Sequence, residues 1–447
     1  AGYTFQDDPD YIFPLEAQAA IDDVNLNQGI SFISHPLDDK IPWTNNDIHG
    51  FTGVEILNGY SSARKTSILN ILKFPLQYLF NKRCALMNTL NYPKENLALW
   101  DEFNKKGDYY GIYALDVHAR LPITKNFQFE WPSYRAMFEL FTLYVKTNSM
   151  FSTNPETSAA TIVSAMRQGR FFSAIEGIAS ANGFDLHFQD RSGKLYEQGS
   201  RIAVTNGDIV LNMPFAFDTQ IKMMRNGELF KSIENKLQQK IRIPIRTAGT
   251  YRLEIFVPGN KFDHLPWILT NPFFLGKKKP LTKFPVIHSI KKPLSIGDKA
   301  FNVEKNSASR GDMRLETIDG AQVLRMDYHL KKQREKKDFW VALARREAIN
   351  FKGYSGLTIT VRSKRVARFW LELRTKRDGK EIAYSHSFPA RSEWKTVSIP
   401  FSRFHSKSKK AGSINLARIE SLFITINNLL TVSNKAGYLQ IKEFGLF

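Results

Sequence analysis

The sequence predicts a multidomain protein in which a partial α/β domain is followed by two all-β sandwiches, the last of them a jelly roll. The chain has 447 residues, which is too long for a single hydrophobic core. Its first part alternates strand-like with helix-like patterns, whereas the rest consists of strand-length segments separated by turns. The excess positive charge, +20 for the whole chain, lies in the last part, which indicates a domain boundary.

The first part, residues 1–170, carries the pattern of a parallel sheet or barrel. Three short runs of β-branched or aromatic residues alternate with helical patterns. Because parallel α/β folds place their chemistry at the carboxyl ends of strands, polar residues after these runs are site candidates. The predicted strands cover residues 29–34, 53–57 and 109–115, and the predicted helices cover 16–27, 63–80, 94–106, 134–146 and 158–169.

The remainder predicts two sandwiches joined by a linker. Residues 171–276 hold strand-length segments separated by Asn-Gly and Pro-Gly turn pairs, as in a small antiparallel sandwich. Residues 277–299 are rich in lysine and proline, which is typical of an extended linker. In residues 300–447 apolar side chains alternate, for example from Leu357 to Val361, and the pattern indicates the strands of a jelly roll.

Charge separates the two parts of the chain. Residues 1–276 contain 27 Lys and Arg against 28 Asp and Glu, whereas residues 277–447 contain 36 against 15. We expect the basic jelly roll, residues 300–447, to bind an acidic glycan, another acidic polymer or an acidic protein. A solvated, solubilising surface is the competing interpretation. No nucleic-acid-binding motif accompanies the charge, so nucleic acid is not an expected partner. No apolar run is long enough to predict a transmembrane segment, and the single cysteine, Cys84, excludes an intrachain disulfide.

Histidine and acidic residues follow the three predicted strands of the first part. His35 follows the first strand, Glu55 lies in the second, and Asp116 and His118 follow the third. Imidazole and carboxylate groups that converge from several strand ends are the ligands of catalytic Zn, Mn or Fe. Such a metal would activate water and neutralise a developing oxyanion. Taken singly, each residue is more often an ordinary structural polar group.

The segments GISFISHP, GFTGVEILNG and GDYYGIYALDVHARLP resemble the polymerase and histidinol phosphatase (PHP) superfamily of metal-dependent phosphoesterases, and in particular its carbaryl-hydrolase-like members. The resemblance runs through residues 1–276. It implies a distorted β/α barrel with two or three divalent metal ions, Zn, Mn or Fe. It also implies that His35, Asp116 and His118 are metal ligands and that, with Glu55, they form the catalytic set.

The opening His-x-His strand of that family and its remaining ligands are not in this sequence. We therefore expect an N-terminal segment of the same gene product, before Ala1, to complete the metal site. On this basis the sequence predicts a metal-dependent hydrolase of phosphoesters or related esters, located outside the cytoplasm in the periplasm or cell envelope. The alternative is a non-catalytic cell-envelope binding or structural protein on a degenerate PHP scaffold.

The final part is similar to the jelly rolls of complex I intermediate-associated proteins and of carbohydrate-binding modules. The similarity lies in FWVALARREAINFKGYSGLTITVRS, SEWKTVSIPFSRF and YLQIKEFGLF. Such domains stack sugar rings on exposed aromatic side chains, although a core position is the competing interpretation for each aromatic residue. The candidate ligand-binding residues are Trp340, Trp370, Tyr384, Arg368 and Arg374.

Overall fold

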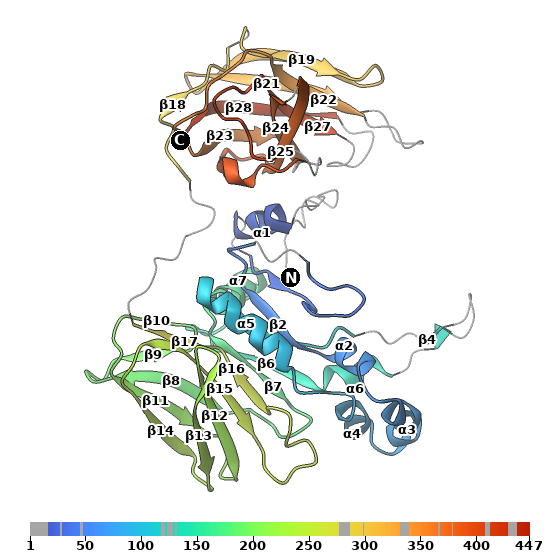
Figure 1. Ribbon diagram of the computed structural model, residues 1–447, viewed down its shortest axis with the longest axis vertical. Coiled ribbons are helices and arrows are strands. Elements are labelled where there is room, and N and C mark those ends of the chain that lie inside the picture. Colours follow the sequence, from blue (N-terminus) through green and yellow to red (C-terminus); the bar gives the residue numbers. More distant parts are fainter. Residues whose placement is uncertain are drawn as a thin grey trace. The chain divides into compact units, whose positions relative to one another are not determined.

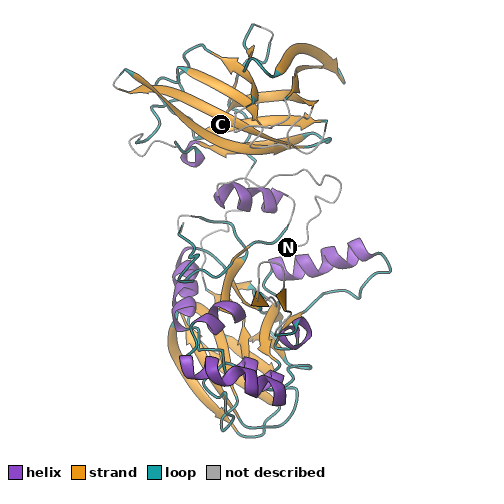
Figure 2. Cartoon of the chain, turned by 90° about the vertical axis from the view of Figure 1, so that its right-hand side faces the viewer, coloured by secondary structure: helices purple, strands orange, loops and turns teal. Residues whose placement is uncertain are grey.

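The computed structural model divides the chain into two compact units (Figure 1). The first unit is Gly29–Leu281, and the second is Thr282–Phe447 together with Ala1–Gln28. Both units contain more strand than helix in the residues that the structure describes, and the helices of the first unit flank its sheets (Figure 2). The structure describes residues 17–26, 29–44, 48–117, 121–122, 128–129, 132–276, 287–297, 299–330, 339–364, 367–377, 379–406, 412–427 and 436–447. None of the helices in these ranges has the length and apolar character needed to cross a bilayer.

A three-stranded parallel sheet lies at the start of the first unit. Its strands β1 (Phe32–Ile33), β2 (Gly53–Asn58) and β3 (Tyr110–Ala114) pair in that order. Every residue of β2 is buried, as expected for the central strand of a parallel sheet. A Cβ atom at Gly53 would lie 2.0 Å from the carbonyl oxygen of Tyr110, so only glycine allows the two strands to pair here.

The prediction of a distorted β/α barrel is wrong, because the parallel sheet stops at β3. The N–H groups of β3 that point away from β2 donate to side chains and not to the carbonyl groups of a further parallel strand. The N–H of Gly111 donates to Asn271 Oδ1 at 2.7 Å, and the N–H of Tyr113 donates to Ser173 Oγ at 3.0 Å. Both acceptors belong to the neighbouring β-sandwich. The strand edge that a barrel would extend is therefore closed by that sandwich.

Three of the predicted helices form with nearly the expected bounds, and the first of them, predicted over residues 16–27, is α1 (Ala17–Leu26). Helix α5 (Lys94–Lys106) coincides with the prediction, and α7 (Pro155–Arg167) starts at its capping residue Asn154, whose side chain accepts the N–H groups of Glu156 and Thr157. The prediction over residues 63–80 is interrupted at Ser67, which caps a new helix. The first unit also contains α2 (Gly59–Arg64), α3 (Ile68–Phe80), α4 (Lys82–Met87) and α6 (Tyr134–Phe138).

The predicted helix over residues 134–146 is wrong in its second half. After α6 the chain enters strand β6 (Phe141–Val145), which pairs antiparallel with β7 (Phe171–Ile175). The strand sequence FTLYV consists of aromatic, β-branched and leucine residues that pack well on a pleated surface, and this preference overrides the helical spacing of its apolar residues.

The rest of the first unit is a β-sandwich. One sheet has the order β10-β17-β15-β16-β7-β6, with β12 paired to β15 and β13 paired to β12, and the other has the order β14-β11-β8-β9. Large side chains such as Phe188, Tyr251 and Trp267 fill the core between them. The strands are β8 (Asp185–Asp190), β9 (Leu195–Glu197), β10 (Arg201–Ile202), β11 (Gly207–Asn212), β12 (Thr219–Arg225), β13 (Glu228–Asn235), β14 (Lys240–Ile245), β15 (Gly249–Phe256), β16 (Ile268–Thr270) and β17 (Phe273–Leu275); β4 (Leu121–Pro122) and β5 (Gln128–Phe129) form a separate pair.

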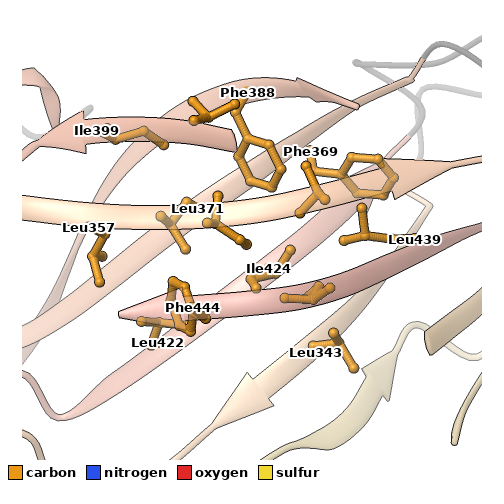
Figure 3. Packing of buried hydrophobic residues seen from close by; sticks show 14 of the residues in the cluster. Leu343, Leu357, Phe369, Leu371, Phe388, Ile399, Leu422, Ile424, Leu439 and Phe444 are labelled. Atoms are coloured by element: carbon orange, nitrogen blue, oxygen red, sulfur yellow. The ribbon is translucent and has the colours of Figure 1, made fainter. Parts of the chain in front are cut away.

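The second unit contains the predicted C-terminal jelly roll. A six-stranded sheet has the order β20-β21-β28-β23-β26 with β18 paired to β28, and a five-stranded sheet has the order β19-β22-β27-β24-β25. The predicted alternation is confirmed, because Leu357, Ile359 and Val361 all belong to the core cluster between the sheets. Figure 3 shows Leu357 in this cluster. The strands are β18 (Lys292–Pro293), β19 (Asn302–Lys305), β20 (Arg310–Ile318), β21 (Ala321–His329), β22 (Trp340–Arg345), β23 (Gly356–Ser363), β24 (Ala367–Arg377), β25 (Lys380–Ala390), β26 (Lys395–Pro400), β27 (Ser421–Asn427) and β28 (Ala436–Leu446), with a 3-10 turn at Phe401–Arg403.

Part of the predicted linker belongs to this jelly roll. Residues 277–286 and 298 lie outside the described residues. In the described stretch 287–297, β18 pairs with β28, His288 stacks on Phe447, and Leu294 is in the core. The lysine and proline content therefore concealed an edge strand, a position that tolerates proline.

Helix α1 (Ala17–Leu26) precedes the first unit in sequence but packs against β25 of the jelly roll. Asp23 forms a fully buried ion pair with Arg368, and Asp22 pairs with Arg403 at 3.1 Å. Burial raises the pKa of Asp22 to about 6, although the neighbouring Arg403 acts to lower it. Two ion pairs thus hold α1 to the edge of the sandwich.

Candidate functional site

The first candidate site is a strand-end cluster formed by His35, Glu55, Asn58 and Asp116. The parallel sheet brings these residues together, because His35 follows β1, Glu55 and Asn58 lie in β2, and Asp116 follows β3. The backbone N–H of His35 donates to Glu55 Oε2, and Asn58 Nδ2 donates to Asp116 Oδ2 at 3.3 Å. The predicted convergence of His35, Glu55 and Asp116 is therefore present.

Two residues of the cluster have a backbone conformation that L-residues rarely adopt. His35 has φ +35° and Asp116 has φ +47°. A non-glycine residue at positive φ costs free energy, and such residues are concentrated at functional sites, where the surrounding structure imposes them. The bond from the His35 N–H to Glu55 and the bond from Asn58 to Asp116 are part of what holds these two turns.

Glu55 is a buried carboxyl group at the centre of the cluster. Its exposed fraction is 5%, and burial raises its pKa, while the hydrogen bond from the His35 N–H opposes the rise. His35 and Asp116 are both close enough to influence this pKa electrostatically. Glu55 contacts the backbone of His35, so its evident role is to position that residue.

The imidazole of His35 is oriented by a backbone carbonyl. Its Nδ1 lies 3.2 Å from the carbonyl oxygen of Ile41. A carbonyl only accepts hydrogen bonds, so Nδ1 is the donor of this bond, which orients the ring. His35 is half-buried and lines a cavity of about 300 Å³ that is also lined by Asp38, Asn58 and Lys65.

Asp38 gives this cavity a fixed negative group. Burial would raise its pKa, but hydrogen bonds from the Ser61 hydroxyl, from two backbone N–H groups and from Arg64 lower the pKa well below its usual range. Arg64 pairs with Asp38 at 3.1 Å. The polar wall is therefore charged and ordered at neutral pH.

A second cavity, of about 500 Å³, lies on the Asp116 side of the cluster. Apolar side chains from α3, α4 and α6 line most of it, among them Phe74, Leu86 and Met137. Asp116 and Tyr60 are among its polar residues. The strand ends thus separate a polar cavity from an apolar one.

The described residues do not by themselves form the predicted metal site. His118 lies outside the described residues, and within the described ranges no group of three His, Cys, Asp or Glu side chains could hold a metal ion. His35 and Asp116 supply two candidate ligands, fewer than Zn, Mn or Fe requires. No chemical step through a metal is assigned to this cluster.

The second candidate site is the outer face of the five-stranded sheet in the jelly roll. Antiparallel partners share a face, so the pairing of Trp340 with Asn427 and of Trp370 with Thr425 places both tryptophans opposite the core. Both tryptophans are partly exposed. Strands β22 and β24 flank β27, so the two residues are separated by about 10 Å across the sheet and are offset by two residues, about 7 Å, along it.

A floor of mostly small side chains adjoins the two tryptophans. Ala342 and Ala344 of β22 face the same side and are buried, and Thr425 and Asn427 of β27 lie between the two tryptophans. Ser387 of β25 lies beyond Trp370, where it accepts a hydrogen bond from the buried Arg368. Phe423 of β27 is buried in the same apolar cluster, together with Ala342, Ala344 and part of Trp340. The face is therefore a shallow floor bounded by two indole rings.

Arginine side chains cover Phe423 and border this floor. The guanidinium of Arg374 lies 4.0 Å from the Phe423 ring centroid, and that of Arg346 lies 5.3 Å from it. Arg374 also pairs with Glu372 and Glu381, at 2.7 and 2.8 Å. These pairs fix the guanidinium groups in place beside the floor.

Two of the predicted ligand-binding residues are not accessible. Arg368 is fully buried in its ion pair with Asp23, and Tyr384 is 3% exposed, with its hydroxyl 3.3 Å from the carbonyl oxygens of Gly412 and Ser413. Tyr384 faces the core because it lies opposite Leu373, an inward residue of β24. Trp340, Trp370 and Arg374 remain as candidates for ligand contact.

Sequence reasoning missed Phe423, Arg346 and the acidic pair Asp22 and Asp23. The strand SLFITIN has apolar residues on both faces, which was a signal that Phe423 is covered. The sequence around Asp22 and Asp23 did not predict their ion pairs, because Asp23 and its partner Arg368 lie 345 residues apart.

Residues 329–442 match the model of the Complex I intermediate-associated protein 30 family. This match agrees with the predicted resemblance of the C-terminal jelly roll and leaves residues 1–276 unassigned. No curated protein matches the chain.

Several solved structures share features of the fold. A family 11 carbohydrate-binding module from Clostridium thermocellum, in complex with a β-1,3-1,4-mixed-linked tetrasaccharide, has 15% identity and a TM-score of 0.29, covering 35% of this chain and 94% of that one. A family 30 module of a cellulosomal cellulase of Clostridium thermocellum has 10% identity and a TM-score of 0.27, covering 36% and 95%. An exo-β-agarase has 8% identity and a TM-score of 0.24, covering 35% and 25%. These TM-scores are too low to assign a function to the chain.

Proposed function

We propose that this chain binds an acidic polysaccharide through the outer face of the five-stranded sheet in its jelly roll. The observation that carries the proposal is the pair of partly exposed tryptophans, Trp340 and Trp370, on one face of that sheet, on either side of β27 and next to the small residues Ala342 and Ala344. Flat sugar faces stack on indole rings, and small side chains leave room for the neighbouring sugar units of the polysaccharide.

The position of the tryptophans suits an extended ligand. They come from strands on either side of β27, and their lateral separation of about 10 Å is comparable to the length of a disaccharide. Two platforms at this separation favour a polymer over a single sugar. Glu372 and Arg374, which pair with each other, follow Trp370 along the same face of β24 and are the polar groups nearest to it on that strand.

The charge of the C-terminal part of the chain, which contains the jelly roll, favours an acidic ligand. Residues 277–447 carry 36 Lys and Arg against 15 Asp and Glu. The guanidinium of Arg374 already pairs with Glu372 and Glu381, so it would bind a carboxylate or sulfate group of the ligand by exchanging one of these partners. Uronate or sulfated sugars would therefore combine ring stacking with ion pairing.

The test is affinity electrophoresis and calorimetry of the full chain with alginate as an anionic glycan and mixed-linkage β-glucan as a neutral one. We expect alginate binding that weakens as salt rises from about 50 to about 500 mM. Trp370→Ala should weaken it about tenfold, in line with the loss of one stacking platform. Trp394→Ala is the matched control. The Trp394 ring lies 4.7 Å from the guanidinium of Arg362, a residue of the six-stranded sheet, whereas the tryptophan pair lies on the five-stranded sheet.

Three outcomes would count against the proposal. Absence of binding to alginate and to sulfated polysaccharides would exclude the ligand class. Stronger binding to the neutral glucan would retain a sugar site but remove the acidic preference. Equal losses in Trp370→Ala and Trp394→Ala would place the ligand elsewhere on the unit.

The strand-end cluster favours a second function, hydrolysis by acid–base chemistry. The specific observation is that His35 and Asp116, both at positive φ, are held around a buried carboxyl group beside two cavities. In the neutral tautomer His35 Nε2 can accept a proton from water. The role proposed for Glu55 is to position His35.

This second function is tested with nitrophenyl phosphate, bis-nitrophenyl phosphate and nitrophenyl acetate, with and without added Mn²⁺ or Zn²⁺. Activity that falls in His35→Ala and survives in His187→Ala, a histidine in the neighbouring β-sandwich of the same unit, would support it. Absence of turnover of all three esters in every condition would reject it.

A further inference from the structure

Helix α3 presents most of its apolar residues to solvent and its amide side chains to the protein. Asn70 Nδ2 bonds the carbonyl oxygen of Asn88 at 3.2 Å, and Asn88 Nδ2 bonds Gln77 Oε1 at 2.9 Å. Phe74 and Tyr78 complete the inward face, where Tyr78 is buried. This is the reverse of an ordinary surface helix, which hides its apolar stripe. The exposed apolar residues are Ile68 at 76%, Leu69 at 58%, Ile71 at 52%, Leu72 at 73%, Leu76 at 63%, Leu79 at 80% and Phe80 at 85%.

The exposed apolar residues occupy about half of the helix circumference at 100° per residue. A partner helix in a coiled coil covers a narrower seam. A half-circumference apolar face on a 13-residue helix suits the boundary between lipid headgroups and acyl chains, in which an amphipathic helix lies flat.

Charge around α3 indicates which surface covers it. Residues 56–94 contain six Lys and Arg and no Asp or Glu. Lys73 lies within α3, and Lys82 and Arg83 begin α4 directly after it; all three are exposed. Glu139, the C-cap residue of α6, is paired with Arg135 of that helix at 3.1 Å. A basic border around an apolar face is complementary to anionic lipid headgroups.

We infer that α3 docks the first unit on an anionic membrane surface, with Leu72, Leu76 and Leu79 inserted among the lipids and Lys73, Lys82 and Arg83 at the headgroups. This interaction is separate from the polysaccharide site, which lies in the other unit. It brings the apolar cavity lined by Ile71, Phe74 and Pro75 of α3 close to the lipid surface.

The test is sedimentation of the full chain with vesicles of phosphatidylcholine alone and with vesicles that contain about 30% phosphatidylglycerol. We expect binding to the anionic vesicles, and a loss of about tenfold or more in the triple variant Leu72→Glu, Leu76→Glu, Leu79→Glu. The matched control is Leu195→Glu, Leu229→Glu, Leu237→Glu, which changes net charge equally at exposed leucines of the same unit. The control also accounts for attraction of the basic jelly roll to the vesicles.

An environment-sensitive dye locates the contact. The single native cysteine is replaced, Cys84→Ser, and the dye is attached after Leu76→Cys or, as control, Leu229→Cys. A blue shift on anionic vesicles at position 76 and none at 229 is expected. Equal losses of vesicle binding in the two triple variants, or no shift at position 76, would overturn the inference. Self-association without lipid that the α3 variant abolishes would instead assign the face to a second copy and also overturn it.

Discussion

The strand-end cluster and the outer face of the jelly roll arrange functional groups in opposite ways. In the cluster, His35, Glu55 and Asp116 are fixed by hydrogen bonds within the cluster and by strained backbone turns. On the sheet face, Trp340 and Trp370 are displayed only because strand alternation points them outward. The first arrangement suits chemistry on one small group, whereas the second suits contact with an extended ligand. Replacements in the cluster should therefore affect structure and function together, while replacements on the open face should affect binding alone.

The largest expected effect on stability is at Arg368, on the part of the sheet face that α1 covers. Arg368→Ala leaves Asp23 buried without its guanidinium partner, and breaking a buried ion pair costs about 3–5 kcal/mol. Hydrogen exchange of peptides from β24 and β25 under native conditions measures this loss. Arg374→Ala, on the same strand but with partly exposed partners, should cost less than about 1 kcal/mol. A loss below about 1 kcal/mol in Arg368→Ala would show that α1 does not depend on this pair.

The next effect tests the centre of the strand-end cluster. Glu55→Ala removes the acceptor of the His35 N–H and should cost about 1–3 kcal/mol. Glu55→Gln keeps an acceptor oxygen and resembles the protonated acid, so it should cost much less. Urea denaturation followed by exchange of β2 peptides separates the two variants. Equal losses would mean that cavity formation and not the hydrogen bond decides the result.

The pH dependence of the first unit should follow Asp38. Its pKa is lowered in the folded state, so its contribution to stability is present above the unfolded-state value near 4 and is lost as the pH falls below it. Asp38→Asn should reduce the acid-induced fall in the thermal midpoint, with an effect on the order of 1 kcal/mol. Thermal unfolding of the wild type and the variant from about pH 6 to about pH 3 measures it. Parallel curves for the two proteins would contradict this assignment.

The smallest expected effect on stability is at Trp370, on the exposed part of the sheet face. Trp370→Ala should change the free energy of unfolding by less than about 0.5 kcal/mol, because a partly exposed side chain away from the core contributes little. Denaturation of the same protein samples used for polysaccharide binding provides the measurement. A loss above about 2 kcal/mol would make Trp370 a structural residue, and its effect on binding would then need another explanation.

Local patterns predicted the elements better than their assembly. The alternation from Leu357 to Val361 follows from the period of a strand with one buried face, so the jelly roll core was visible in the sequence. The end of the parallel sheet at β3 could not be predicted in this way. It depends on hydrogen bonds from β3 to Asn271 and Ser173, which lie far from β3 in sequence. The same limit applies to Arg368: its spacing on β24 predicted the correct face, but nothing local indicated that α1 covers it.

The placement of α1 has a consequence for biosynthesis. It leaves the ribosome before the whole first unit, yet its ion-pair partner Arg368 follows Asp23 by 345 residues. At about 5–20 residues per second, this helix waits on the order of tens of seconds for the strand that it covers. During that interval the first unit, which lies between α1 and the jelly roll in sequence, can complete its folding. Helix α1 can dock on the jelly roll only after the strand that carries Arg368 has been synthesised.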